Sequence, residues 1–407
     1  MILMQQKLSD IAIYPKQFSE SKILGAKVRV PFADSTVNFL NEISKKLMRD
    51  KRSREFSDII TLAFWIRKSN IEKLKMDFFQ NHPKKTMLGR GIVFHIAPGN
   101  VAVNFAYSFF TGLLAGNNNI VKLAPKEFEQ TGIVLDAIKT VCEMPEYTEI
   151  ANGTAIVKYA IDDEITTYFS SICDARIMWG GDVTVNAIRS YPLPPRSTEI
   201  MFADRYSFSA IKADEVLKAD DISEIALGFY NDTYLMDQNA CSSPRMVVWQ
   251  GADQQVEQAK SKFWNAVHRV VEREYQMEPT LVIDKYTRIF QDAIERKKIK
   301  KENDGDNLIT RIQIEKLPSD VENIRCAGGY FVETTVKNLN EIAHIVNKKY
   351  QTMTYYGFRQ DELRNFVMEN SLRGIDRIVP MGQALAFGLI WDGYDLVSNL
   401  SRICDVL

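Results

Sequence analysis

From Gly89 onward the sequence alternates short apolar runs with longer helical stretches, and this alternation limits the fold more than any other feature. A first apolar run at 91–96 (GIVFHI) is followed by a turn, a long apolar helical stretch at 101–115 and a second short run at 120–123. Parallel strands need such a crossover between them. The same alternation continues as far as a helix that begins near Asp182. It predicts an α/β fold with a doubly wound parallel sheet.

A chain of 407 residues is too long for one ordinary domain. A proline-rich stretch at 191–196 (YPLPPR) precedes a second α/β pattern that starts near residue 210. We therefore expect a cofactor-binding domain with N-terminal helices over 1–210 and a catalytic domain over 211–380. The segment 381–407 is expected to return to the first domain or to form an oligomer interface.

The bulk composition excludes several classes of function. The formal net charge is -1, which favours neither nucleic acid nor anionic membrane as a partner. No apolar run reaches the roughly 18 residues that a membrane span needs. The first residues (MILMQQKLSD) lack the basic and apolar regions of a signal peptide. We expect a cytoplasmic protein, with a charged, exposed loop at 299–306.

The chain has five cysteines, widely spaced and without a CxxC pair, so we expect neither a disulfide framework nor a metal site. Cys241 differs from the others in its surroundings, because it lies among small polar residues in QNACSSPR (238–245). A loop cysteine of this kind is accessible and can ionise, which makes it a candidate nucleophile. The alternative is an ordinary structural cysteine.

Three further candidates lie where predicted strands end, the edge at which open α/β sheets bind ligands. Asn100 follows the first strand and could donate its amide to an oxyanion, or cap the next helix. Lys122 ends the second strand and could contact a ribose or phosphate, or be a solvated lysine. Gly180 and Gly181 form a turn that would admit a pyrophosphate, or an ordinary connection, and the GxGxxG fingerprint is absent.

The order of these stretches resembles that of the aldehyde dehydrogenase superfamily. IAPGNVA is similar to its oxyanion-asparagine motif, AGNNNIVKLAP to its ribose-binding lysine motif, MWGGDVTVNAI to its phosphate turn and QNACSSPR to its nucleophile loop. QTMTYYG and RGIDRIVPMGQALAFGLIWDGYDL further resemble the bacterial long-chain acyl-CoA reductases (LuxC-type). The resemblance implies two doubly wound parallel-sheet domains with the active site in the cleft between them.

The resemblance also implies roles for the matching residues. It makes Cys241 the nucleophile, Asn100 the oxyanion donor, Lys122 the ribose contact, and Gly180 with Gly181 the phosphate turn. Glu199, in RSTEIMF, falls where hydrolytic members keep a general base.

Two departures from the superfamily pattern matter for the chemistry. The two glycines that normally follow the general base are Met201 and Phe202 here, and Arg325 stands near the place of a glutamate that contacts the nicotinamide ribose. NAD-preferring members also carry an acid three residues after the lysine, where this chain has Pro125 followed by Lys126. Loss of the acid and gain of a cation would accommodate a 2′-phosphate, which favours NADPH over NADH.

These features lead to one expected activity and two alternatives. The expected activity is NADPH-dependent reduction of a fatty acyl-CoA, or another activated acyl group, to an aldehyde through a cysteine thioester. The resemblance further suggests an acyl-activating synthetase or acyl donor protein as a partner, and leaves a homo-oligomer open. The alternatives are a hydrolytic aldehyde dehydrogenase that oxidises aldehyde to acid and a non-catalytic acyl-binding homologue.

Overall fold

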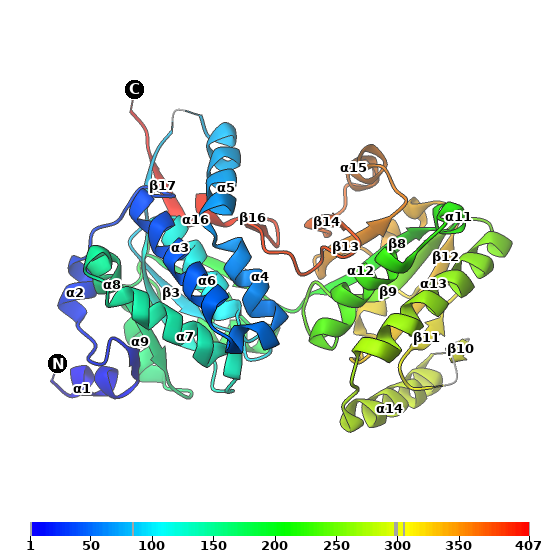
Figure 1. Ribbon diagram of the computed structural model, residues 1–407, viewed down its shortest axis with the longest axis horizontal. Helices are drawn as coiled ribbons and strands as arrows, with labels where there is room; N and C mark the ends of the chain where they lie inside the picture. The colour runs from blue at the N-terminus through cyan, green and yellow to red at the C-terminus, as the bar shows by residue number, and fades with distance from the viewer. Residues whose placement is uncertain (1, 84, 297–299, 304–305, 407) are drawn as a thin grey trace. The chain divides into compact units, whose positions relative to one another are not determined.

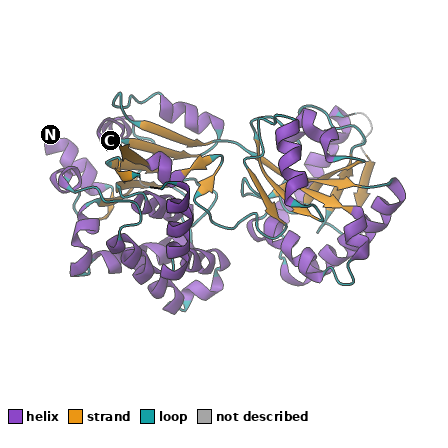
Figure 2. Ribbon diagram, turned by 90° about the horizontal axis from the view of Figure 1, so that it is seen from above, coloured by secondary structure: helices purple, strands orange, loops and turns teal. Residues whose placement is uncertain are grey.

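The computed structural model describes residues 2–83, 85–296, 300–303 and 306–406 (Figure 1). The chain divides into two compact units, Met1–Ala203 with Phe387–Leu407, and Asp204–Ala386. The first unit ends before the boundary expected at residue 210, because β8 (Tyr206–Lys212) belongs wholly to the second sheet. In each unit, helices flank a sheet of mainly parallel strands (Figure 2).

The first unit is built on a six-stranded sheet in the order β1-β5-β4-β3-β6-β7, in which only β1 runs antiparallel to its neighbour. Strands β3, β4 and β5 proceed toward one edge, whereas β6 and β7 lie on the other side of β3. The direction of winding therefore reverses between β3 and β6, and loops that diverge at such a point leave room for a ligand. The strands are β1 (Ala12–Tyr14), β3 (Ile92–Ile96), β4 (Asn118–Leu123), β5 (Thr154–Lys158), β6 (Ala175–Trp179) and β7 (Thr198–Phe202).

Alternate residues of these strands pack into two cores, one on each face. Val93 and Val121 pack with α6 and α7, whereas Phe94 and Ile120 pack with α9 and α10. The long N-terminal helix α3 adds to the first of these cores through one apolar face. The helices are α1 (Ile2–Asp10), α2 (Glu20–Gly25), α3 (Asp34–Arg49), η1 (Arg52–Glu55), α4 (Ser57–Trp65), α5 (Lys68–Asn81), α6 (Asn104–Leu114), α7 (Glu129–Cys142), η2 (Pro145–Tyr147), α8 (Thr148–Asn152), α9 (Asp163–Ile172) and α10 (Asp182–Arg189).

The C-terminal segment completes the first unit. Strand β17 (Ser401–Cys404) pairs antiparallel with β2 (Thr86–Gly89), so red and blue segments lie together in Figure 1. The Asn117 side chain also donates to the carbonyl of Leu400 at 2.8 Å. The remaining elements of this segment are β15 (Ile390–Trp391), β16 (Tyr394–Asp395) and α16 (Leu396–Leu400).

The second unit is built on a seven-stranded sheet in the order β10-β11-β12-β9-β8-β13-β14, parallel except for β10. Its strands are β8, β9 (Pro244–Gln250), β10 (Lys300–Asn303), β11 (Thr310–Gln313), β12 (Tyr330–Val336), β13 (Tyr350–Tyr356) and β14 (Arg377–Pro380). Its helices are α11 (Ala213–Lys218), α12 (Ser223–Thr233), η3 (Tyr234–Met236), α13 (Asp253–Glu274), α14 (Pro279–Glu295), η4 (Val321–Asn323), η5 (Leu339–Ile345) and α15 (Gln360–Glu369). The loop expected at 299–306 instead contributes β10, while residues 299, 304 and 305 lie outside the described residues.

The segment after β14 is bound to α12 by a buried carboxylate. Asp232 accepts hydrogen bonds from the backbone N–H of Gly382 at 2.6 Å and of Ala384 at 2.8 Å. Gly228 allows this approach, since a Cβ there would lie 3.3 Å from the backbone of Gly382. Arg377 donates to carbonyls of the same segment, including that of Ala384 at 2.7 Å. These contacts give a structural reason for the PMGQALA part of the tail motif.

No helix in the described ranges is both long enough and apolar enough to cross a bilayer.

Candidate active site

The loop after β3 carries Asn100 at the carboxyl edge of the first sheet. The N–H of Ala97 donates to the carbonyl of Lys122 at 3.0 Å, which extends the β3–β4 pairing into the loop. Asn100 is exposed, and α6 begins only at Asn104, with Val103 in the N-cap position. The alternative that Asn100 caps this helix is therefore wrong. Its side chain remains at the ligand-binding edge.

A buried hydrogen-bond network fixes the ends of β3, β4 and β6 relative to each other. His95 contacts Asn119 Oδ1 through Nε2 at 2.9 Å and Ser108 Oγ through Nδ1 at 2.8 Å. Trp179 donates its indole N–H to the same Ser108 oxygen at 3.0 Å. Burial lowers the pKa of His95 to about 4, so the imidazole is neutral and serves as a structural link. Sequence reasoning missed this role, although a histidine inside an apolar strand was a visible signal.

Gly180 and Gly181 form the turn between β6 and α10. The Gly180 N–H donates to the carbonyl of Phe202 at 3.1 Å, and a Cβ on Gly180 would lie 3.2 Å from the Thr184 side chain. Gly181 is the N-cap of α10, whose first N–H groups lack intrahelical partners and suit an anion. Asp182, the first helical residue, brings a negative charge to the same end and so weakens its attraction for phosphate.

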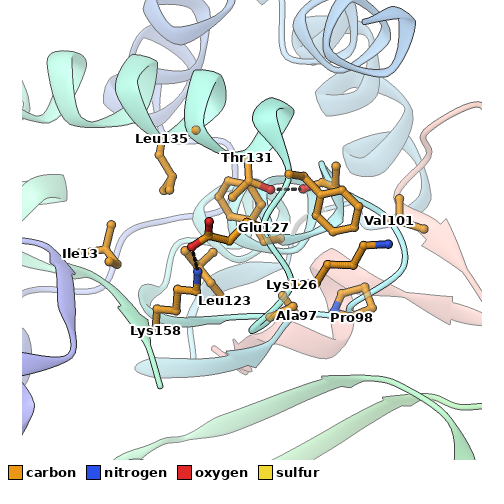
Figure 3. Close-up of a pocket in the computed structure, with 15 residues that line it drawn as sticks. Ile13, Ala97, Pro98, Val101, Leu123, Lys126, Glu127, Thr131, Leu135 and Lys158 are labelled. Carbon is orange, nitrogen blue, oxygen red and sulfur yellow. Dashed lines mark hydrogen bonds and ion pairs between the residues drawn. The ribbon is translucent and has the colours of Figure 1, made fainter. Parts of the chain in front are cut away.

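The side chains of Lys122 and Lys126 have different surroundings. The Lys122 ammonium lies 4.6 Å from the ring centre of Tyr159, on the face of the sheet that packs with α9 and α10. Burial lowers its pKa, and among the described residues no carboxylate pairs with it. Lys126 instead lines a cavity with Leu123, whose side chain belongs to the opposite face (Figure 3). The two cations are therefore directed toward different faces of the sheet.

That cavity, of about 280 Å³, lies in the first unit beside the loop that carries Asn100 (Figure 3). Most of its wall is apolar, and an ion pair between Glu127 and Lys158 at 2.7 Å bounds one side. Gly132 of α7 contributes space, since a Cβ there would meet no atom within 4 Å. Its apolar walls come from Ile13, Ala97, Pro98, Val101, Ala102, Phe105, Leu123, Ala124, Phe128 and Leu135.

The structure does not support Glu199 as a general base. Glu199 is the second residue of β7 and pairs in register with Arg176, at the amino edge of the sheet. Phe202, at the carboxyl edge, is three residues further on, or roughly 10 Å along the strand. The Glu199 carboxylate binds Arg176, with Nε and Oε1 3.1 Å apart, and lies 3.5 Å from Arg189. Because its carboxylate lies at that edge and contacts two arginines, Glu199 has a structural role.

In the second unit, Cys241 lies in the loop between η3 and β9, and Gln238 fixes this loop. Asp237 and Gln238 both have left-handed backbone conformations, with φ of 49° and 57°. The fully buried Gln238 side chain accepts from the N–H groups of Gly329 and Tyr330 at 2.8 and 3.0 Å, and donates to the Pro244 carbonyl at 3.1 Å. The first residue of QNACSSPR therefore fixes the loop, which sequence reasoning did not predict.

Two polar side chains contact Cys241 itself. Ser207 donates from Oγ to the Cys241 carbonyl at 2.7 Å, and the Gln351 amide donates to Sγ at 3.2 Å. Cys241 is partly exposed, whereas burial raises the pKa of Cys142 and of Cys173 to about 12. A partly exposed thiol with a polar donor at its sulfur is the arrangement that favours a nucleophile.

The two arginines near this loop make mainly backbone contacts. Arg245 donates to the carbonyls of Cys326, at 2.8 Å, and Gln238. Burial and the neighbouring Arg325 lower its pKa. Arg325, at the expected place of the ribose-binding glutamate, donates to the Glu322 carbonyl at 2.6 Å. Arg245 therefore helps to hold the Cys241 loop against the loop before β12.

Comparisons with known proteins show the family and the fold of this chain. A family model described as acyl-CoA reductase (LuxC) matches residues 68–404, which is most of the chain. No curated protein sequence matches. Many solved structures match, and the two described next are similar at identities that show the fold alone.

Two of these structures illustrate the likeness. A salicylaldehyde dehydrogenase from Pseudomonas putida G7 is 13% identical, with a TM-score of 0.66 over 99% of this chain and 90% of that one. The glyceraldehyde-3-phosphate dehydrogenase from Methanocaldococcus jannaschii complexed with NADP is 11% identical, with a TM-score of 0.65 over 99% and 93%. The expected aldehyde dehydrogenase-like fold is thus confirmed. The chain belongs to the acyl-CoA reductase (LuxC) family and is an oxidoreductase that acts on acyl or aldehyde groups.

Proposed function

We propose that this enzyme reduces a fatty acyl-CoA to the fatty aldehyde with NADPH, through a thioester on Cys241. The observation that carries the proposal is the state of Cys241, a partly exposed thiol on a rigidly held loop whose sulfur accepts a hydrogen bond from Gln351. Membership of the acyl-CoA reductase family supplies the reaction class.

In the proposed reaction, the Cys241 thiolate attacks the acyl carbonyl and the CoA thiolate leaves. A free thiol has a pKa of about 8.5, so this leaving group needs little help from an acid. The family resemblance assigns the binding of the oxygen anion to the Asn100 amide and the Cys241 N–H, and removing one such donor typically costs about 2.7–4 kcal/mol in the transition state. An acyl thioester on Cys241 results.

The thioester carbon must then be reduced, and a bound nicotinamide cofactor supplies the hydride. The same donors would hold the oxygen of the resulting hemithioacetal. Its collapse forms the aldehyde carbonyl and returns the C–S bonding electrons to Sγ of Cys241. Exclusion of water matters at this stage, because water would hydrolyse the thioester.

Residues of the first unit support a nicotinamide dinucleotide as the reductant. Lys122 offers a partly buried ammonium with no carboxylate partner among the described residues, and the N–H groups that follow Gly181 suit an anion. Pro125 stands where NAD-preferring members have an acid, which supports NADPH. Lys126 supports it less, because Lys126 and Lys122 are directed to different faces of the sheet.

The apolar cavity beside the Asn100 loop is our candidate for the acyl chain. An apolar cavity of about 150 Å³ holds one benzene molecule. A volume of about 280 Å³ therefore has room for roughly a dozen carbon atoms. Its wall of aliphatic and aromatic side chains suits a hydrocarbon chain better than a polar one.

The contacts of Glu199 weigh against the hydrolytic alternative, since that activity requires a base to activate water. The decisive experiment incubates the enzyme with radiolabelled dodecanoyl-CoA, with and without NADPH, and measures protein labelling and aldehyde. Cys241→Ala should abolish both, while Cys404→Ala, at an exposed thiol on β17, should retain both. A labelled Cys241→Ala protein would refute the assignment. CoA-independent oxidation of decanal to acid would instead favour the hydrolytic enzyme, and a wild-type protein that binds acyl-CoA without labelling or turnover would favour the non-catalytic homologue.

A further inference from the structure

Two adjacent residues of strand β13 are linked to Cys241, Gln351 directly and Thr352 through Ser207. Gln351 donates from Nε2 to Sγ at 3.2 Å. Its neighbour Thr352 donates its backbone N–H to Ser207 Oγ at 3.1 Å, and this hydroxyl donates in turn to the Cys241 carbonyl at 2.7 Å. One contact is made to the reacting atom, whereas the other is made only to the backbone that carries it.

The orientation of the Gln351 amide follows from a contact of its oxygen with Thr352. Thr352 Oγ1 donates to Gln351 Oε1 at 3.2 Å, so the oxygen is engaged there and the NH2 group is the end directed at sulfur. Gln351 as a whole is 1% exposed and belongs to a strand with a parallel neighbour on each side. The donor is therefore held in place and shielded from water, conditions under which a hydrogen bond to an anion is strong.

A cysteine nucleophile is often activated by histidine, but the four histidines here bind other groups. His95 bonds Asn119 and Ser108, and His268 bonds Asp306. His82 bonds the carbonyl of Phe78 and the hydroxyl of Ser398, and His344 bonds the carbonyl of Glu341. A neutral amide acts differently from a cation. It lowers the thiol pKa only moderately. A moderate shift is useful, because the nucleophilicity of a thiolate falls as its thiol pKa falls.

We propose that Gln351 is a catalytic residue that stabilises the Cys241 sulfur anion each time it forms. This inference rests on the proposed role of Cys241. The anion exists twice in the cycle, before attack on the acyl carbonyl and after collapse of the hemithioacetal. In the second event the C–S bond breaks, its electron pair moves to Sγ, and an oxygen lone pair completes the aldehyde C=O bond. The Gln351 N–H donates a hydrogen bond to the sulfur and so stabilises the negative charge that forms there.

The test measures the rate of iodoacetamide alkylation of Cys241 against pH, by mass spectrometry of its peptide, with the exposed Cys404 as an internal reference. Gln351→Leu should raise the apparent pKa of Cys241 by about one pH unit and slow its alkylation at pH 7 about tenfold, as expected when a hydrogen bond to a charged group is lost. Gln351→Glu should raise this pKa further, because a carboxylate repels the thiolate. Cys404 should be unaffected in every variant.

Ser207→Ala is the matched control, because it removes the contact to the Cys241 backbone and leaves the donor at sulfur. Its alkylation profile should follow the wild type. Coincident profiles for Gln351→Leu and wild type would overturn the inference, and so would equal shifts in Gln351→Leu and Ser207→Ala, which would indicate a structural role. In turnover assays Gln351→Leu should lower kcat about tenfold with little change in KM. If the Cys241→Ala protein still becomes acylated, the proposed function is wrong. If Cys241 is acylated in the wild type but Gln351→Leu leaves its pKa unchanged, only the inference about Gln351 is wrong.

Discussion

Arg176 and Glu199 form an ion pair between adjacent strands, with Nε and Oε1 3.1 Å apart and the arginine side chain 1% exposed. Removing one partner of a buried ion pair leaves the other charge buried and unpaired, which typically costs about 3–5 kcal/mol. Glu199→Ala should therefore lower the free energy of unfolding in urea by an amount toward the lower end of that range, because Glu199 is partly exposed. The double variant Arg176→Leu/Glu199→Leu should recover most of the loss. A Glu199→Ala protein of wild-type stability that has lost activity would restore Glu199 as a candidate base.

Asn100→Ala should lower kcat about 10²–10³-fold with little change in KM, because an oxyanion donor acts mainly in the transition state. Asn100→Asp should be slower still, since a carboxylate repels the developing oxygen anion. Steady-state kinetics with one acyl-CoA and saturating NADPH measure both. A loss smaller than threefold in either variant would remove Asn100 from the proposed site.

Gly132→Leu should shorten the longest acyl chain that the enzyme accepts. The new side chain would enter the cavity without backbone strain, because Gly132 is helical and open space surrounds its Cβ position. The ratio of kcat/KM for dodecanoyl-CoA over hexanoyl-CoA should fall at least tenfold. Gly25→Leu is the control, since its Cβ position is equally open and Gly25 does not line the cavity. Equal chain-length profiles for the two variants would mean that the chain binds elsewhere.

Lys122→Ala should raise the KM for both NADPH and NADH about tenfold or more, since the ammonium would contact the part that the two cofactors share. Lys126→Ala should have a smaller effect on the KM of either cofactor, because Lys126 lines the cavity on the other face of the sheet. Cofactor titrations with each variant provide the measurement. A larger loss in Lys126→Ala than in Lys122→Ala would contradict this order.

The second unit should lose stability as pH rises from about 5 to 8. Burial raises the pKa of Asp232 to about 7, against the hydrogen bonds from Gly382 and Ala384 that lower it. Below the unfolded-state pKa this carboxyl is protonated in both states, and as pH rises toward 7 the unfolded state loses its proton first. The free energy of unfolding should therefore fall by about 3 kcal/mol between pH 5 and pH 8. Asp232→Asn should flatten this dependence in urea titrations, and an unchanged slope in that variant would assign it to other groups.

The local pattern of apolar residues predicted much of the secondary structure of the first unit, because the periods of strands and helices appear in the spacing of neighbouring residues. The apolar run at 91–96 contains β3, and the helical stretch expected at 101–115 contains α6. The pattern failed where a prediction depended on which end of a strand a residue occupies. Glu199 lies near the start of β7, and only the register against Arg176 reveals it.

Contacts between distant parts of the chain were also beyond reach from the sequence. Gln351 and Cys241 are 110 residues apart, and Asp232 and Gly382 are 150 apart. Each pair depends on how strands and helices assemble, which single residues do not encode. The candidate residues Cys241, Asn100, Lys122, Gly180 and Gly181 came from motif order, and their roles remain predictions.

The pairing of β2 with β17 sets an order for biosynthesis. Residues 86–89 leave the ribosome early, but their strand partner at 401–404 is translated only after the whole second unit. Because domains generally fold as units during synthesis, the inserted second unit can fold while the first still lacks its last strand. During that interval β2 presents an unpaired strand edge, the kind of surface at which nascent chains aggregate and chaperones bind.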